Sequence, residues 1–142
     1  MQTLSKYALS FLHQPYRWGG DDPLAGFDCS GLVQEILKGG AGFLFSTDMT
    51  AHDLYVFLKT GKEKPAVPQQ GALAFFGTEA KIVHVGFCID SFRMIEAGGG
   101  GSKTLTTEDA IKQNAFVRMR PIQTRKDFVG CYLPDYRHLP ML

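Results

Sequence analysis

The sequence lacks an excess of charge of either sign. Among its 142 residues, 15 lysines and arginines face 14 aspartates and glutamates, which leaves a formal net charge of +1. Nucleic-acid-binding proteins usually carry a strongly basic patch, so this balance argues against a nucleic-acid partner. Recognition of a substrate must then depend on a local site rather than on the field of the whole molecule.

Long apolar runs and a full set of paired cysteines are missing too. No stretch has the length of a membrane span, and the N-terminal MQTLSKYALSFLHQPYRWGG lacks the pattern of a secretory signal. Three cysteines, Cys29, Cys88 and Cys131, cannot all pair, and their spacing fits no zinc site. We therefore expect synthesis in the cytoplasm, free thiols and no metal.

The chain has the composition of one globular domain over residues 1–142, with 44% hydrophobic and 20% charged residues. Apolar spacing predicts helices over 3–13, 29–38 and 50–59 and a helical turn over 107–113. Alternating or short apolar runs predict strands over 72–76, 83–89, 92–97, 115–120 and 128–133. Helices first and strands later indicate an α+β fold with an antiparallel sheet of about five strands.

Cys29 stands at the start of the second predicted helix, within the stretch FDCSG. A thiol in the first turn of a helix lies near unpaired N–H groups and the positive end of the helix dipole, which favours the reactive thiolate. Asp28 is a credible N-cap, and Gly31 would leave room for a substrate backbone beside the thiol. The local sequence alone leaves a nucleophile and a buried structural thiol equally open.

A cysteine nucleophile needs a base, and His84 is the strongest candidate among the four histidines. It lies within the strand-like IVHVGFCID, whereas His13, His52 and His138 are better explained as surface or helix-end residues. If strands 83–89 and 92–97 form a hairpin with an odd loop over 89–91, Glu96 lies opposite His84 on the same face. Glu96 could otherwise be an ordinary exposed strand carboxylate.

Four motifs together resemble the NlpC/P60 family of cysteine peptidases: PYRWGG (15–20), FDCSGLV (27–33), GALAFF (71–76) and HVGFCID (84–90). The resemblance covers roughly residues 4–133. It implies a papain-like fold and hydrolysis of amide bonds in bacterial cell-wall stem peptides, typically between γ-D-glutamate and a diamino acid. It implies no metal or organic cofactor.

The resemblance also implies roles for individual residues. Cys29 is expected to be the nucleophile, His84 the base and Tyr16 a hydroxyl beside the nucleophile that helps the oxyanion hole. Asp28 and Ser30 are expected to bind the free amino end of the stem peptide, although helix capping explains both equally well. Glu96 falls where the family usually has a second histidine, or another polar residue, that orients the base, so a glutamate there is a departure.

Several interpretations remain to be tested against a structure. Trp18 is expected to pack in the core, and the run Gly98–Gly101 to be a plain flexible connection. The short chain without wall-binding repeats suggests a phage or prophage protein, with phage tail proteins as partners and release to the cell wall. Two other functions stay open: an amidase or acyltransferase acting on another amide, and a tail or assembly module of the same fold without catalysis.

Overall fold

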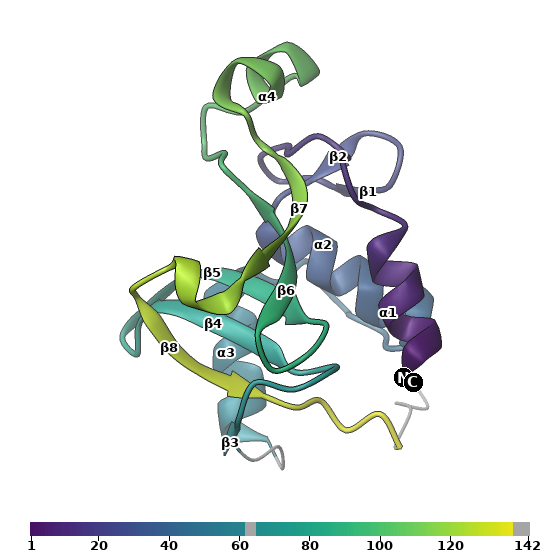
Figure 1. The fold of residues 1–142 in the computed structure, drawn as a ribbon, viewed down its shortest axis with the longest axis vertical. Coiled ribbons are helices and arrows are strands. Elements are labelled where there is room, and N and C mark those ends of the chain that lie inside the picture. Colours follow the sequence, from purple (N-terminus) through teal and green to yellow (C-terminus); the bar gives the residue numbers. More distant parts are fainter. Residues whose placement is uncertain (62–64, 138–142) are drawn as a thin grey trace.

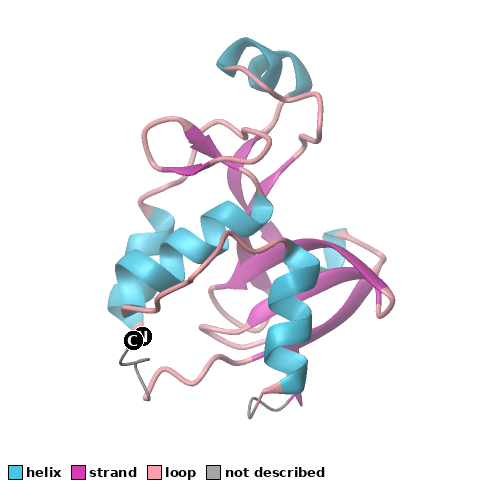
Figure 2. Cartoon of the chain, turned by 180° about the vertical axis from the view of Figure 1, so that it is seen from behind, coloured by secondary structure: helices cyan, strands magenta, loops and turns pink. Residues whose placement is uncertain are grey.

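The helices gather on one side of a large antiparallel sheet (Figure 1, Figure 2). The computed structural model describes residues 1–61 and 65–137, so the prediction for His138 lies outside the described residues. The four α-helices are α1 Gln2–Leu9, α2 Cys29–Glu35, α3 Ala51–Thr60 and α4 Thr107–Gln113. Seen from behind, α1, α2 and α3 lie in front of the sheet, while α4 projects beyond it (Figure 2).

The helix boundaries follow local capping chemistry. Thr50 and Thr106 each begin a helix with a reciprocal capping box, in which the third residue of the helix bonds back to the cap. The first helix ends at Leu9, four residues before the expected end, and the chain then turns through His13 with a φ of 74°. The second ends at Glu35 and continues as a π-helical turn, η1 (Ile36–Gly40).

Six strands form the main sheet in the order β3-β8-β4-β5-β6-β7, and every pairing is antiparallel. They are β3 Pro65–Ala66, β4 Leu73–Thr78, β5 Lys81–Cys88, β6 Arg93–Gly98, β7 Phe116–Pro121 and β8 Phe128–Tyr132. The five longer strands were expected. The two-residue β3 was missed because it is short and begins with proline, as was the separate pair β1 (Asp21–Asp22) and β2 (Gly26–Phe27).

The β5–β6 hairpin has a different register from the expected one. Phe87 pairs with Ile95, and Ile89 donates its N–H to the carbonyl of Arg93 at 2.9 Å, which closes a loop over 90–92. The Asp90 side chain accepts the N–H groups of the last loop residue and of Arg93, so this turn is one residue further along than expected. The loop is still odd in length. His84 and Glu96 therefore share a face, but as diagonal neighbours rather than opposed ones.

Two apolar clusters occupy the two faces of the sheet. The larger cluster packs beneath the helices and includes Leu73, Phe75, Val85, Phe87 and Ile95. The smaller one, which includes Ala74, Phe76, Cys88, Met94 and Cys131, lies on the other face. Both predicted core cysteines are thus buried and free. Across residues 1–61 and 65–137, no helix combines the length and the apolar character needed to span a membrane.

Candidate active site

Cys29 is the first residue of α2, and the residue before it prepares that helix end. The Asp28 carboxylate accepts the N–H of Gly31 at 2.7 Å and, through its second oxygen, the N–H of Gly19 at 3.0 Å. Asp28 is therefore the N-cap, as expected, and it also ties the preceding turn to the helix. Cys29 itself remains partly exposed to solvent at the positive end of α2.

The structure requires a glycine at position 31 for a reason that differs from the expected one. A Cβ at this position would overlap the carbonyl oxygen of Gly20, which accepts the N–H of Asp28 at 3.0 Å. The missing side chain makes room for the chain's own turn, not for a substrate backbone. The YRWGG and DCSG motifs are thus two parts of one packed unit around the thiol.

His84 lies between Cys29 and Glu96. Its Nε2 is 2.6 Å from Oε1 of Glu96, and both side chains are buried, with Glu96 only 1% exposed. Cys29 lines the same hollow as His84 and is near enough to contribute to raising the pKa of the imidazole. Because Nε2 is engaged by the carboxylate, the ring nitrogen left for the sulfur is Nδ1. This is the order of groups that a Cys–His–carboxylate triad requires.

His84 and Glu96 shift each other's pKa so that both are charged at neutral pH. Burial lowers the pKa of His84, but its hydrogen bonds and charge interactions with Cys29 and Glu96 outweigh burial and raise that pKa to about 9. Burial raises the pKa of Glu96, but the His84 hydrogen bond and the nearby arginines reverse this and lower it. At neutral pH the histidine is therefore an imidazolium held by a carboxylate.

Arg120 completes the surroundings of Glu96. Its Nη1 is 3.2 Å from Oε2, and no aligned hydrogen-bond donor reaches that oxygen among the residues with a described structure. The residue of β7 that pairs with Glu96 is Arg118. Arg120 lies two residues further along β7 and reaches the Glu96 carboxylate diagonally. Sequence reasoning missed Arg120; the alternation of β7 would reveal it only once the β6–β7 register is known.

A hollow of about 230 Å³ opens in front of the three residues. Its lining comprises Tyr16, Trp18, Cys29, Val83, His84, Glu96, Ala97, the glycines 98–101, Arg120 and Arg125. The structure contradicts the assignment of Trp18 to the core: its side chain lines this hollow and is 52% exposed. Tyr16 is buried, and burial, followed by the charges of Cys29 and Asp28, raises the pKa of its hydroxyl, which stays a proton donor.

The glycine run forms one wall of the hollow and is more than a plain connection. Gly101 donates its N–H to Oγ1 of Thr104 at 3.0 Å, and the same hydroxyl hydrogen-bonds Gln113 of α4. Thr104 is completely buried. A Cβ at Gly100 would overlap the Tyr16 ring, so the backbone approaches that ring as closely as only glycine allows.

Gly100→Ala is expected to lower kcat/KM about tenfold to a hundredfold, because the added methyl group displaces either Tyr16 or the wall beside Cys29. The matched control is Gly101→Ala, whose Cβ would meet no atom within 4 Å and should change the rate by no more than about twofold. Steady-state kinetics on one cell-wall stem peptide, the substrate class expected from the sequence, measures both. Equal effects of the two substitutions would contradict a specific contact with Tyr16.

The raised pKa of His84 predicts that the protein loses stability as pH rises from about 6.5 to about 9. Across that interval the folded protein keeps a proton on His84 that the unfolded chain has released, so the free energy of unfolding falls. The difference amounts to at most about 3 kcal/mol. Urea unfolding at both pH values measures it, and His84→Gln should remove this part of the slope. An unchanged slope in that variant would contradict the assignment.

The expected amine-binding residues are placed at the helix start rather than in the hollow. Ser30 is buried and its hydroxyl lies 3.3 Å from Oδ1 of Asp28, which already accepts the Gly31 N–H. Burial, opposed by these hydrogen bonds and reinforced by the charge of Asp48, raises the pKa of Asp28. Asp28 caps the helix and Ser30 donates to Asp28, so capping explains Asp28 only; binding of a substrate amine stays a prediction. In the described part of the chain, no three His, Cys, Asp or Glu side chains are grouped to hold a metal ion.

With this geometry established, comparisons with known proteins place the chain in a family. The profile of the NlpC/P60 family matches residues 13–135. The chain belongs to the NlpC/P60 family. It is 40% identical over 104 residues to the bifunctional muramidase/DL-endopeptidase CwlT of Bacillus subtilis, covering 70% of this chain and 30% of that protein. It is 31% identical over 135 residues to the murein DD-endopeptidase MepH of Escherichia coli, covering 89% and 49%.

Solved structures of NlpC/P60 domains share the fold. The NlpC/p60 domain of the peptidoglycan hydrolase SagA superposes with a TM-score of 0.68 at 20% identity, covering 94% of this chain and 97% of that one. RipD of Mycobacterium tuberculosis, described as a non-catalytic NlpC/p60 domain protein, gives 0.66 at 19% identity, covering 94% and 95%. The expected α+β papain-like fold is confirmed. The chain spans less than half the length of either curated relative.

Proposed function

We propose that this NlpC/P60 domain is a cysteine endopeptidase that hydrolyses amide bonds in the stem peptides of bacterial peptidoglycan. The observation that carries the proposal is the buried His84–Glu96 pair, which lines one hollow together with Cys29. The names of the two relatives, both endopeptidases, support a cell-wall substrate. Among wall bonds we favour the one between γ-D-glutamate and a diamino acid, on the strength of the motif resemblance.

The arrangement supports a reaction in two stages. The Cys29 thiolate attacks the scissile carbonyl, and the oxyanion accepts hydrogen bonds from the Cys29 N–H, in the first turn of α2, and from the Tyr16 hydroxyl. The imidazolium of His84 then donates its Nδ1 proton to the leaving amine. Neutral His84 next takes a proton from a water molecule whose oxygen attacks the acyl carbon. The C–S bond then breaks, which releases the acid and restores the Cys29 thiolate and the imidazolium. Glu96 keeps the ring oriented throughout.

Catalysis is favoured over a purely binding role, although RipD demonstrates that this fold also occurs without activity. Glu96 is only 1% exposed, and burying an ionised carboxylate costs free energy even when it is paired. A binding module would gain nothing from that cost, whereas a catalytic histidine needs a partner that orients it. An amidase or acyltransferase acting on another amide would use the same three groups. The setting of the reaction, including association with phage tail proteins, stays a prediction from the sequence.

The test is incubation with purified sacculi and with two defined peptides, one containing the γ-D-glutamyl–diamino acid bond and one a D,D-cross-link. Mass spectrometry of the products should reveal new termini at the first bond. Cleavage of the cross-link alone would move the proposal to a DD-endopeptidase. No cleavage of any wall substrate, by protein whose Cys29 reacts readily with a thiol reagent, would favour the other amide hydrolases. An unreactive Cys29 would favour the non-catalytic role.

A further inference from the structure

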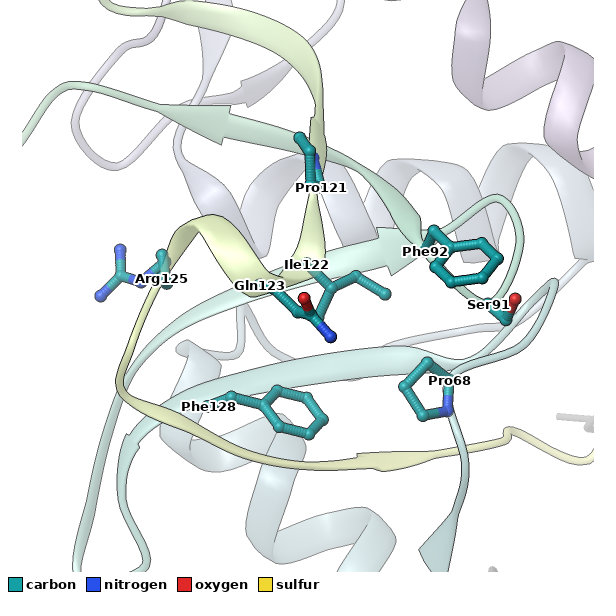
Figure 3. A pocket seen from close by; sticks show the side chains of 8 residues that line it. All are labelled: Pro68, Ser91, Phe92, Pro121, Ile122, Gln123, Arg125 and Phe128. Atoms are coloured by element: carbon teal, nitrogen blue, oxygen red, sulfur yellow. The ribbon is translucent and has the colours of Figure 1, made fainter.

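Arg125 lies where two hollows of the molecule meet. It follows the short 3₁₀ turn η2 (Ile122–Thr124) after β7, and it lines the hollow in front of Cys29. It also lines a larger hollow of about 330 Å³ on the other side, whose walls are largely apolar (Figure 3). Figure 3 shows the guanidinium at one end of that larger hollow, pointing away from Ile122 and Phe128 at its centre. Arg125 thus borders both hollows, with its head group at the edge of the apolar one.

The side chain of Arg125 is held in place before any ligand arrives. Its Nε and Nη2 donate to the two carboxylate oxygens of Asp127, at 3.0 and 2.8 Å. The guanidinium carbon lies 5.3 Å from the centre of the Phe76 ring, which itself contacts the His84 ring. Nη1 has no partner among the described residues, and the side chain is 31% exposed. Arg125 is thus a fixed cation with open donor positions.

Its charge reaches the catalytic groups. The charge of Arg125 is one of the causes that lower the pKa of Glu96. The pKa of the Arg125 guanidinium is raised, mainly by its hydrogen bond to Asp127 and to a smaller extent by the charges of Glu96 and Cys29. Arg120, the other arginine of the hollow, is already paired with the Glu96 carboxylate. Arg125 is instead oriented by Asp127, so its Nη1 can bind a group of the substrate without withdrawing a counter-ion from Glu96.

We propose that Arg125 is a specificity-determining residue that binds a free carboxylate of the substrate next to the scissile amide. This rests on the proposed function, because peptidoglycan stem peptides supply such a carboxylate in two places. A glutamyl residue linked through its γ-carbonyl keeps its α-carboxylate free, and the diamino acid on the other side of the bond can carry one as well. The Nη1 edge of the planar guanidinium, which Asp127 leaves open, can donate to either carboxylate.

The test uses two matched pairs of peptides in which one carboxylate at a time is replaced by its carboxamide. The first pair varies the glutamyl α-carboxylate and the second the carboxylate of the diamino acid. In one pair the wild-type protein should cleave the acid about tenfold to a hundredfold more efficiently than the amide, mainly through KM. Arg125→Gln should abolish that preference, and Arg125→Lys should keep part of it. The affected pair identifies which carboxylate is bound.

Arg93→Gln is the matched control, because Arg93 also donates Nε and Nη2 to a nearby aspartate, both to Oδ2 of Asp90, at the exposed β5–β6 turn. It should leave the acid-to-amide ratio unchanged. A wild-type protein that cleaves acid and amide equally in both pairs overturns the inference, as does an Arg125→Gln variant that loses kcat equally on all four peptides. If Arg125→Gln unfolds, Arg125→Lys and the wild-type ratios still decide. No cleavage of any peptide would instead refute the proposed function.

Discussion

Replacing Cys29 by alanine is expected to reduce cleavage of wall peptides to the background rate, a loss of about 10⁴-fold or more. The reason is that the attack on the carbonyl has no other nucleophile: the remaining groups of the hollow can bind and polarise the substrate but cannot form the acyl intermediate. The measurement is product formation from the defined peptide, followed by mass spectrometry over long incubation. Cys29 is partly exposed at the helix start, so the fold should persist.

The chain offers a matched control in Cys131, a free thiol buried in the smaller cluster on the other face of the sheet. Cys131→Ala should cost about 1 kcal/mol of stability and leave kcat/KM near the wild-type value. Iodoacetamide should label the wild type at Cys29 before either buried cysteine, and substrate should protect it. Residual turnover by Cys29→Ala well above the background would mean that another group is the nucleophile.

Much of this site could be predicted because its signals are local. The sequence predicts a capped helix from Asp28, Cys29 and the apolar spacing that follows them. It predicts a strand from the alternation around His84. The sequence left the parity of the β5–β6 hairpin open, and the structure has the odd loop that puts His84 and Glu96 on one face. The register itself was two positions off, because it depends on how Asp90 engages the backbone of the turn.

The remaining features of the site depend on segments that are far apart in the sequence, and no local sequence pattern predicts them. Arg120 and Arg125 reach the hollow from β7 and the turn after it, which only the order of strands places beside β6. The sequence does not distinguish Gly100 from a flexible loop glycine, because its close contact with the Tyr16 ring is a property of the fold. Trp18 looks like core, yet it is exposed beside the thiol. In each case the property belongs to a contact between segments far apart in the sequence.

Glu96→Gln is expected to lower kcat/KM by about 10²- to 10⁴-fold, even though the amide has nearly the same shape. The hydrogen bond and charge of Glu96 contribute to raising the pKa of His84 to about 9, so the neutral amide lowers that pKa. It can also present its NH₂ group to Nε2, which would favour the wrong tautomer. Arg120 loses its counter-ion at the same time. Fewer molecules then carry the imidazolium that protonates the leaving amine.

The pH profile distinguishes this explanation from a general loss of structure. Activity that needs a protonated His84 should persist to about pH 9 in the wild type and should fall at a lower pH in Glu96→Gln. Glu96→Asp, which keeps the charge on a shorter side chain, should recover part of the rate. Glu108→Gln, on the exposed face of α4, is the matched control and should behave as wild type. If Glu96→Gln keeps both the rate and the alkaline limb of the wild type, then the buried carboxylate only fills space, and another group orients His84.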